Sequence, residues 1–397
     1  MKHRSKSIPR AHKGTDLRLL INGEAYYPQL FADIRNARHE LLLETFILFD
    51  DNIGQQLADA LCEAAQRGVE VHLTIDGWGS AWLPAHYASR LRESKVNLHV
   101  YDPVPSTPKK LGLRPNILRR MHRKLVVIDR EIAFIGGINF GEDHLAETHP
   151  EGKQDYAVRA CGSIAEQVGD FISEEIERLG ERRRRRWRLP RRRVPRRWAQ
   201  QENGSEVFFV TRDNRKHRSD IERFYKVGLR RARQDIFIAN AYFFPSYGFI
   251  WQMRQAVRRG VRVTLILQGQ PDKEYVRTAA NTLYDYLLDA GVDIFEYTRR
   301  PLHGKVAVFD DAWCTVGSSN LDPLSFASNA EANLFIYDRE FTGQLRDHLT
   351  QLKQLDCRRI SRSEVPRQSG WRHLIRIVAF HLMRRFPNWL GGRFSTR

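Results

Sequence analysis

The sequence contains an internal repeat, and a chain that follows one plan twice is constrained to fold as two similar units. The two halves align at an offset that falls from about 195 residues to 181. In the first half, residues 37–49 predict an apolar strand and are followed by a predicted helix that ends at Gly68. Residues 232–244 and a helix ending at Gly260 repeat that order in the second half, and a further predicted strand follows each helix.

Strands that alternate with helices favour an α/β fold with buried, parallel strands. We therefore expect two similar lobes, each a mostly parallel β-sheet flanked by helices, packed face to face as a pseudo-dimer. The first lobe is expected at 14–180 and the second at 204–360. An arginine-rich linker at 181–203 would join them, and a basic amphipathic segment would follow at 361–397.

The chain carries a large positive charge. Its 397 residues include 65 Lys and Arg against 47 Asp and Glu, a formal balance of +18. Such a balance indicates an anionic partner, either a phospholipid surface or a nucleic acid. Residues 182–197 hold 11 arginines and no acid, so the rest of the chain has 54 bases against 47 acids, or +7. A run of like charge this dense is typical of a solvated linker or surface loop.

Hydropathy and cysteine usage limit the cellular setting. No stretch of 18 apolar residues occurs and the start is polar, so the sequence predicts neither a membrane span nor a secretory signal. The four cysteines, Cys62, Cys161, Cys314 and Cys357, form no CxxC pair. The spacing therefore predicts neither a disulfide framework nor a zinc site, and it fits a reducing cytosol.

Six positions recur in both halves at unchanged spacing, five of them with the same residue. They are His122, Lys124, Asp129, Gly136, Gly137 and Asn139 in the first half, and His303, Lys305, Asp310, Gly317, Ser318 and Asn320 in the second. Positions i and i+2 of a strand point to one face, so each histidine and its lysine present an imidazole and an ammonium together. A single HxK is usually a surface pair on a strand. Its recurrence in matching places instead favours a phosphate site that contains a nucleophile.

This duplicated pattern resembles the signature of the phospholipase D superfamily, and the resemblance covers nearly the whole chain. More narrowly, the runs ETFILF, MHRKLVVID, IGGINF, QDYAV and VGSSNLDPLS are similar to those of bacterial cardiolipin synthases. The polar start and the ending FHLMRRFPNWLGG most resemble their B branch.

The resemblance implies that the two motifs meet between the lobes and form one active site. One histidine attacks phosphorus to give a phosphohistidine, while the other protonates the departing alcohol and later deprotonates the incoming one. We expect His122 to be the nucleophile and His303 the acid and base. The groups expected to bind the nonbridging phosphate oxygens are Lys124, Lys305, Asn139 and Asn320.

The family also implies roles for four acidic residues. Each histidine is oriented there by an acid some thirty positions downstream, which matches Asp155 and Glu331. Asp129 and Asp310, although part of the signature, are expected to tie the turn that follows each motif strand, so that their loss would misplace the strands. No metal and no cofactor is implied.

The reaction implied is phosphatidyl transfer from one phosphatidylglycerol to another, which gives cardiolipin and glycerol. It exchanges one phosphodiester for another, and the chain has no GxxxxGK[ST] phosphate loop. Transfer instead of hydrolysis requires that water be kept from the phosphohistidine, and the apolar runs 46–49 and 242–245 are candidates to wall the site.

Other functions remain open at this point. A phospholipase D, or a phosphatidyltransferase with another donor such as phosphatidylethanolamine, would use the same residues. A nuclease of the superfamily is disfavoured because the aromatic residues cluster in apolar strands rather than in polar, solvent-facing patterns, so no nucleic acid partner is expected. A membrane-binding scaffold with a degenerate site is disfavoured because both motifs are intact.

The C-terminal region offers a device for membrane contact. Residues 371–386 place apolar side chains at helical spacing with arginines largely opposite, which suits a helix in the interface of an anionic bilayer or a terminal helix packed on the second lobe. We expect a protein peripheral to the inner membrane, on its cytoplasmic side. The oligomeric state stays open.

Overall fold

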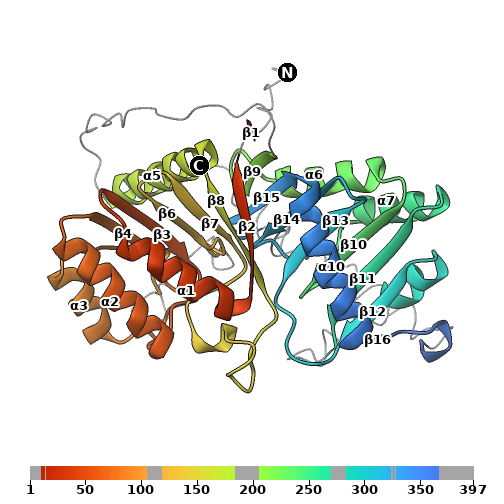
Figure 1. Ribbon diagram of the computed structural model, residues 1–397, viewed down its shortest axis with the longest axis horizontal. Coiled ribbons are helices and arrows are strands. Elements are labelled where there is room, and N and C mark those ends of the chain that lie inside the picture. Colours follow the sequence, from red (N-terminus) through yellow and green to blue (C-terminus); the bar gives the residue numbers. More distant parts are fainter. Residues whose placement is uncertain are drawn as a thin grey trace.

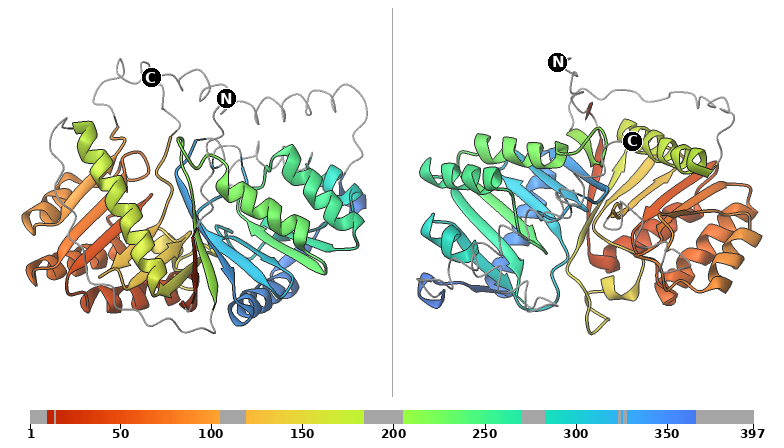
Figure 2. Two further views of the ribbon diagram at one scale, coloured as in Figure 1. Left: turned by 90° about the horizontal axis from the view of Figure 1, so that it is seen from above. Right: turned by 180° about the vertical axis from the view of Figure 1, so that it is seen from behind.

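The computed structural model has two α/β lobes, each built on its own β-sheet (Figure 1). It describes residues 10–13, 15–104, 119–183, 205–269, 283–322, 325 and 328–365. Elements of the first half, coloured red to yellow, lie on one side and those of the second half, green to blue, on the other (Figure 1). The two views of Figure 2 show the same division from other directions. The expected pair of lobes is confirmed.

A seven-stranded sheet in the order β2-β8-β7-β6-β3-β4-β5 forms the first lobe. Its strands are β2 (Asp16–Ile21), β3 (Glu40–Thr45), β4 (Glu70–Asp76), β5 (Asn97–Tyr101), β6 (Leu125–Ile128), β7 (Ile132–Gly136) and β8 (Tyr156–Cys161). One face packs on α1 (Asn22–Arg35), α2 (Asn52–Gln66) and α3 (Ala85–Glu93). The other face packs on α5 (Ser163–Arg183), and the short 3-10 helix η1 (Glu142–His144) follows β7.

A nine-stranded sheet in the order β1-β9-β15-β14-β13-β10-β11-β12-β16 forms the second lobe. Its strands are β1 (Ala11–Lys13), β9 (Glu206–Arg212), β10 (Asp235–Asn240), β11 (Arg262–Gln268), β12 (Asp293–Tyr297), β13 (Lys305–Phe309), β14 (Trp313–Gly317), β15 (Glu331–Tyr337) and β16 (Cys357–Arg359). The helices are α6 (Asp220–Arg231), α7 (Tyr247–Arg258), α10 (Arg339–Leu355) and the 3-10 helix η2 (Arg362–Glu364). Because β1 pairs with β9, residues 11–13 belong to the second sheet although they precede the first lobe in the sequence.

The sheets are mixed, so the expectation of mostly parallel sheets is wrong. Only β3-β4-β5 and β10-β11-β12 run parallel, and every other neighbouring pair is antiparallel. The reason lies in the connections. Parallel neighbours need a long crossover, whereas the motif strands β6 and β7, like β13 and β14, are joined by short turns that permit only antiparallel pairing.

Two glycines end the repeated helices where the sequence predicts. Gly68 follows α2 with φ of +91°, and Gly260 follows α7 with φ of +85°. A Cβ at either position would meet nothing within 4 Å, so it is the left-handed backbone and not crowding that favours glycine there.

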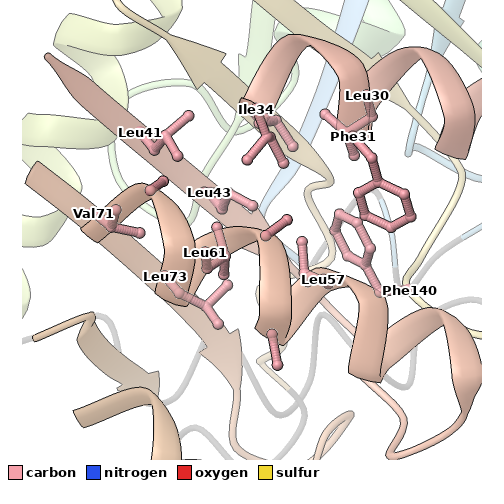
Figure 3. Close-up of a cluster of buried hydrophobic side chains, with 14 of the residues drawn as sticks. Leu30, Phe31, Ile34, Leu41, Leu43, Leu57, Leu61, Val71, Leu73 and Phe140 are labelled. Carbon is pink, nitrogen blue, oxygen red and sulfur yellow. The ribbon is translucent and has the colours of Figure 1, made fainter. Parts of the chain in front are cut away.

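The protein has three apolar clusters, one within each lobe and one between them. The first lies between α1, α2 and their sheet, where Leu30, Ile34 and Leu61 pack towards Leu41 and Leu43 of β3 (Figure 3). An equivalent cluster covers the outer face of the second sheet. The third joins buried residues of both sheets with those of α5 and α10, so the lobes share one core at their interface, as face-to-face packing requires.

The acidic turns anchor the motif hairpins at the ends away from the histidines. Asp129 has φ of +50°, and its carboxylate accepts the backbone N–H groups of residues 38–40 at 2.7 to 2.9 Å. Asp310 has the same φ and accepts from residues 233–235 at 2.8 to 3.2 Å. Five residues of extended chain, roughly 16 Å, separate Asp129 from Lys124. These two signature residues therefore lie outside the group that contains the imidazoles, and they tie the turn as expected.

We predict that Asp129→Ala lowers the free energy of unfolding by about 2 kcal/mol or more, because three N–H groups lose a charged acceptor. Activity per folded molecule should stay within about tenfold of the unmodified protein, because the carboxylate acts through the fold. Urea unfolding checks the first expectation, and assays on the folded fraction check the second. Asp311→Ala, at an exposed acid beside the second turn, is the matched control. A fully stable but inactive D129A protein would show that the carboxylate takes part in the reaction.

Candidate active site

Two isolated β-bridges join the lobes where the motifs begin. Each pairs the residue before a motif histidine with a residue of the other lobe: Met121 with Ala330, and Leu302 with Gln154. The backbone N–H of His122 donates to Ala330 O and that of His303 to Gln154 O, both at 2.9 Å. The backbone of each motif histidine is thus bound to a residue of the other lobe, and the residue that follows this partner in the sequence is a buried acid.

The two imidazoles are held by carboxylates of the opposite lobe. His122 Nδ1 lies 2.9 Å from Glu331 Oε2, and His303 Nδ1 lies 2.6 Å from Asp155 Oδ2. Both carboxylates are fully buried. The expectation that each acid serves the histidine of its own half is wrong, because the bridges set Glu331 beside His122 and Asp155 beside His303.

The carboxylates also determine which ring nitrogen is available. An ionised carboxylate only accepts, so each Nδ1 carries the donated proton and each Nε2 is left for chemistry. Burial lowers the pKa of His122. Burial, followed by the charges of Lys305 and Lys153, takes the pKa of His303 well below its usual range. Both rings are therefore neutral in the free protein, with a lone pair on Nε2.

Two buried lysines make the site electropositive. The Nζ of Lys124 donates to His122 O at 2.8 Å, and that of Lys305 donates to His303 O. Burial and the charge of Lys305 lower the pKa of Lys124 to about 7. Burial lowers the pKa of Lys305 to about 8, against the opposing charges of Asp155 and Glu331. Cations held this far from water are stabilised by an anionic ligand, as a phosphate site requires.

The two motif asparagines are buried beside the hairpins. Asn139 Oδ1 accepts the N–H of Ile47 at 3.2 Å, and its amide nitrogen lies 3.4 Å from His144 Nε2, which leaves one amide N–H able to bind an oxygen. Asn320 Oδ1 has no hydrogen-bond partner among the described residues. Their role in phosphate binding stays a prediction.

One of the two predicted apolar walls reaches an imidazole. The Phe46 ring meets His122 edge-on at 4.9 Å between centroids, and Lys124 Nζ lies 5.2 Å from the same ring. In the other run, Phe243 is buried and packs on Phe249, so it belongs to the core of the second lobe.

Sequence reasoning missed two residues that contact the acids. Ser318 Oγ donates to Glu331 Oε2 at 2.6 Å, and the buried His144 places Nδ1 3.5 Å from Asp155 Oδ2. GGIN and GSSN differ at two positions, and the replacement of Gly137 by Ser318 in the second motif is the signal that could have indicated this contact. His144 lies five residues beyond Asn139 and had no such signal.

One group of side chains has the composition of a metal site. Among the described residues, His144, Asp155 and His303 each place one possible ligand atom within 4.8 Å of the others. The short hydrogen bond between His303 and Asp155 already uses the atoms that an ion would need. The donor set therefore suits a hydrogen-bonded imidazole and carboxylate better than a metal.

Comparisons with known proteins place the chain in a family. A family model described as "Cardiolipin synthase, PLD-like domain" matches residues 30–151 and 225–353, and each block contains one motif. Cardiolipin synthase B of Shigella flexneri is 48% identical over 380 residues, which cover 96% of this chain and 90% of the relative. The chain belongs to the phospholipase D-like cardiolipin synthase family. Cardiolipin synthase A of Pseudomonas putida (strain GB-1) is 31% identical over 348 residues, 85% of this chain and 69% of that one.

A solved structure supports the fold of this cardiolipin synthase family member. Phosphatidylserine synthase of Haemophilus influenzae superimposes with a TM-score of 0.67 at 13% identity, over 94% of each chain. At that identity the likeness concerns the fold alone.

The crossed pairing predicts which imidazole each acid controls. Glu331→Gln keeps the shape of the side chain but removes its charge, so the pKa of His122 should fall while that of His303 changes less. Asp155→Asn should do the reverse. Titration of the side-chain nitrogens by NMR on histidine-labelled protein reads both values. A fall at His303 in the Glu331 variant would contradict the pairing across the lobes.

The lysines predict how anion binding depends on pH. Their pKa values are lowered to about 7 and about 8, so both amines lose their protons as the pH rises through these values. Sulfate keeps its charge from pH 6 to pH 9, and its affinity should fall by at least about tenfold over that range. Calorimetry with sulfate measures this. Lys124→Met should bind more weakly at pH 6 and show a smaller decrease, and a pH-independent affinity would contradict the assignment.

Proposed function

We propose that this chain is a cardiolipin synthase that transfers a phosphatidyl group from one phosphatidylglycerol to another and releases glycerol. One observation carries the proposal: the imidazoles of both motifs are held through Nδ1 by buried carboxylates of the opposite lobe, with two buried lysines beside them. Two available Nε2 atoms in one cationic site are what a two-step phosphoryl transfer through a phosphohistidine needs.

The first step forms a bond between His122 Nε2 and phosphorus. His303, neutral in the free protein, takes up a proton at Nε2 as the phosphodiester anion binds. It gives that proton to the glycerol oxygen as the bond from phosphorus to this oxygen breaks. In the second step His303 takes the proton of a hydroxyl group on another phosphatidylglycerol. The hydroxyl oxygen attacks phosphorus, the bond to His122 breaks, and cardiolipin is released. One phosphodiester replaces another and the proton returns to His303, so no nucleotide is consumed.

The division of labour between the imidazoles follows their carboxylates. The contact of His303 with Asp155 is 2.6 Å, shorter than the 2.9 Å between His122 and Glu331, whose oxygen also accepts from Ser318. The shorter contact with a carboxylate better stabilises an imidazolium, which favours His303 as acid and His122 as nucleophile. The lysines oppose protonation of His303 in the free protein, and the negative phosphodiester offsets their charge.

The surrounding groups serve the transition state. Lys124, Lys305 and the two motif asparagines are proposed to bind the nonbridging oxygens as negative charge develops. The Phe46 ring against His122 would restrict water at the phosphohistidine, which favours a lipid hydroxyl as acceptor.

The reaction is tested with purified protein and phosphatidylglycerol dispersed in detergent. We expect cardiolipin and glycerol in equal amounts. Phosphatidic acid as the sole lipid product would make the protein a phospholipase, and a product formed only after phosphatidylethanolamine is added would identify another donor. Cleavage of labelled DNA with no lipid product would remove the lipid function.

We predict that His122→Ala and His303→Ala each abolish turnover while the protein stays folded, because each imidazole has a separate step. Circular dichroism checks the fold. Quenching a reaction with phosphorus-labelled lipid and mapping the labelled peptide should place the adduct on His122. A label on His303 would reverse the roles, and an active single variant would contradict a shared site.

We further propose that the chain docks peripherally on an anionic phospholipid surface. Within the described residues, no helix combines the length and the apolar character needed to cross a bilayer. The predicted docking segment at 371–386 and the arginine run at 182–197 lie outside the described residues, apart from the end of α5. Exposed aromatic residues near the site support docking independently of both.

In the first lobe the exposed aromatic is Trp82, which is 81% accessible. Two residues before it, Ser80 Oγ donates to Phe46 O at 3.1 Å, and the Phe46 ring contacts His122. In the same loop, Trp78 stacks with Arg120 at 4.5 Å, two residues before the histidine. An indole this exposed, so close to the reacting groups, suits insertion between lipid headgroups.

In the second lobe, Tyr247 and Trp251 are 50% and 54% accessible and lie one turn apart on α7. The segment before α7 is joined to the other motif, since the N–H of Phe244 donates to Leu321 O at 2.7 Å, next to Asn320. Both lobes therefore present aromatic side chains on segments that adjoin the site, as docking on a lipid surface requires.

We predict that the double variant Trp82→Ala, Trp251→Ala binds phosphatidylglycerol vesicles at least about tenfold more weakly, because two interfacial indoles are lost. Turnover on detergent-dispersed lipid should be retained. Vesicle sedimentation measures binding, and quenching of tryptophan fluorescence by brominated acyl chains locates the contact. Trp313→Phe, at a buried tryptophan, should leave the quenching unchanged. Equal losses in vesicles and detergent would contradict a docking role.

A further inference from the structure

We propose that His144 is a positioning residue that supplies Asp155 with a second side-chain donor, as Ser318 does for Glu331. The other oxygen of Asp155 accepts the backbone N–H of Tyr156 at 2.8 Å. The proposal rests on the catalytic roles given above to the imidazoles and their carboxylates. It concerns a residue outside both motifs.

The two carboxylates have unlike surroundings at equivalent positions. At Glu331, one oxygen accepts from His122 and also from the Ser318 hydroxyl at 2.6 Å. The motif position that corresponds to Ser318 is Gly137. A Cβ there would come within 2.3 Å of Asp155 Oδ1, so the first half has no room for a serine at this place.

His144 reaches the same carboxylate from η1. Its Nδ1 lies 3.5 Å from Asp155 Oδ2, the oxygen that accepts from His303, and the two imidazole rings meet edge-on at 5.3 Å between centroids. His144 is fully buried, and its Nδ1 has no hydrogen-bond partner among the described residues. At 3.5 Å the contact is longer than a normal hydrogen bond, so this ring nitrogen is a buried donor that faces the Asp155 carboxylate and can bond to it after a small shift.

The other ring nitrogen fixes the tautomer. His144 Nε2 accepts the backbone N–H of Asn139 at 3.3 Å and lies 3.4 Å from the amide nitrogen of the same residue. The single proton of the neutral ring must then sit on Nδ1, where it faces Asp155. Burial takes the pKa of His144 well below its usual range, which keeps the ring neutral. His144 therefore connects the asparagine of the first motif with the acid that orients the histidine of the second.

A second side-chain donor on Asp155 affects His303 in two ways. It holds the carboxylate, and hence the imidazole, in one orientation. It also withdraws part of the negative charge that would stabilise the imidazolium, so loss of His144 should raise the pKa of His303 and loosen its ring. The other groups that face His303 stay in place in such a variant: Asp155, Lys124, Lys153, Lys305 and His122.

The test replaces His144 by Phe, which fills the ring volume without a donor, and by Gln, which keeps an N–H donor. We expect His144→Phe to lower turnover about tenfold, the scale of losing an outer partner of a reacting group. It should raise the pKa of His303 measured by NMR and leave that of His122 unchanged. His144→Gln should recover part of both effects. Ser325→Ala, at the buried position five residues after Asn320, is the matched control in the other motif.

Because the NMR titration does not depend on lipid turnover, it separates this proposal from the proposed function. An unchanged pKa of His303 in folded His144→Phe protein would overturn it, even if turnover fell. It would also be overturned if a chelator removed the activity of the unmodified protein and Zn²⁺ restored it, since His144 would then be a metal ligand. If His144→Phe does not fold, His144→Ala and His144→Gln replace it in the test. Full turnover of both variants, together with an unchanged pKa of His303 in His144→Gln, would then refute a positioning role.

Discussion

The structure depends on a reciprocal exchange between the lobes, in which each contributes the carboxylate that holds the imidazole of the other. Glu331 binds His122 and Asp155 binds His303, and a backbone bridge precedes each contact. Neither half could orient its own histidine in isolation. Duplication of one unit therefore produced a site that exists only at the interface, and the apolar cluster shared by the two sheets supplies the stability that holds this interface together.

Burial of the two carboxylates affects both the stability of the interface and the pKa values in the site. An ionised carboxylate in a low-dielectric interior must be paired and hydrogen-bonded, and both acids meet this requirement only when the lobes are assembled. The same burial lowers the pKa values of the imidazoles and lysines around them. Stability and reactivity consequently have a common origin, since the water excluded from the acids is also excluded from the phosphorus centre.

Much of this arrangement can be predicted from sequence because it is local or duplicated. The helix ends at Gly68 and Gly260 follow from backbone conformation, and the matched motifs indicate that two histidines act together. The pairing of Asp155 and Glu331 could not be predicted in the same way. A spacing along the chain does not say which lobe a carboxylate faces, and the family's spacing of some thirty residues suggested the wrong partner for each.

The antiparallel hairpins of the motifs show a different limit of prediction from the sequence. The short acidic turns of the sequence indicate antiparallel hairpins, whereas the alternation of strands and helices indicates parallel sheets. The prediction followed the alternation and was wrong for the strands of the motifs. His144 shows a third, because it has no counterpart at the same place in the second half and comparison of the halves therefore passes over it. Comparison of the two halves finds the residues that they share, so it does not find a residue such as His144 that compensates for a difference between them.

The charges of the assembled site explain why it should be selective for a phosphodiester. The two buried carboxylates offset much of the charge of the two buried ammonium groups, Lys153 adds a further positive charge near His303, and the neutral imidazoles add none. The depressed pKa values of the lysines show that the carboxylates do not fully compensate for the lost hydration. A single negative charge between the lysines restores that compensation, whereas a neutral ester would leave them uncompensated. The monoanionic phosphate of a diester thus meets a site whose electrostatic balance is completed by its binding, and the same step draws a proton towards the imidazole that must act as the acid.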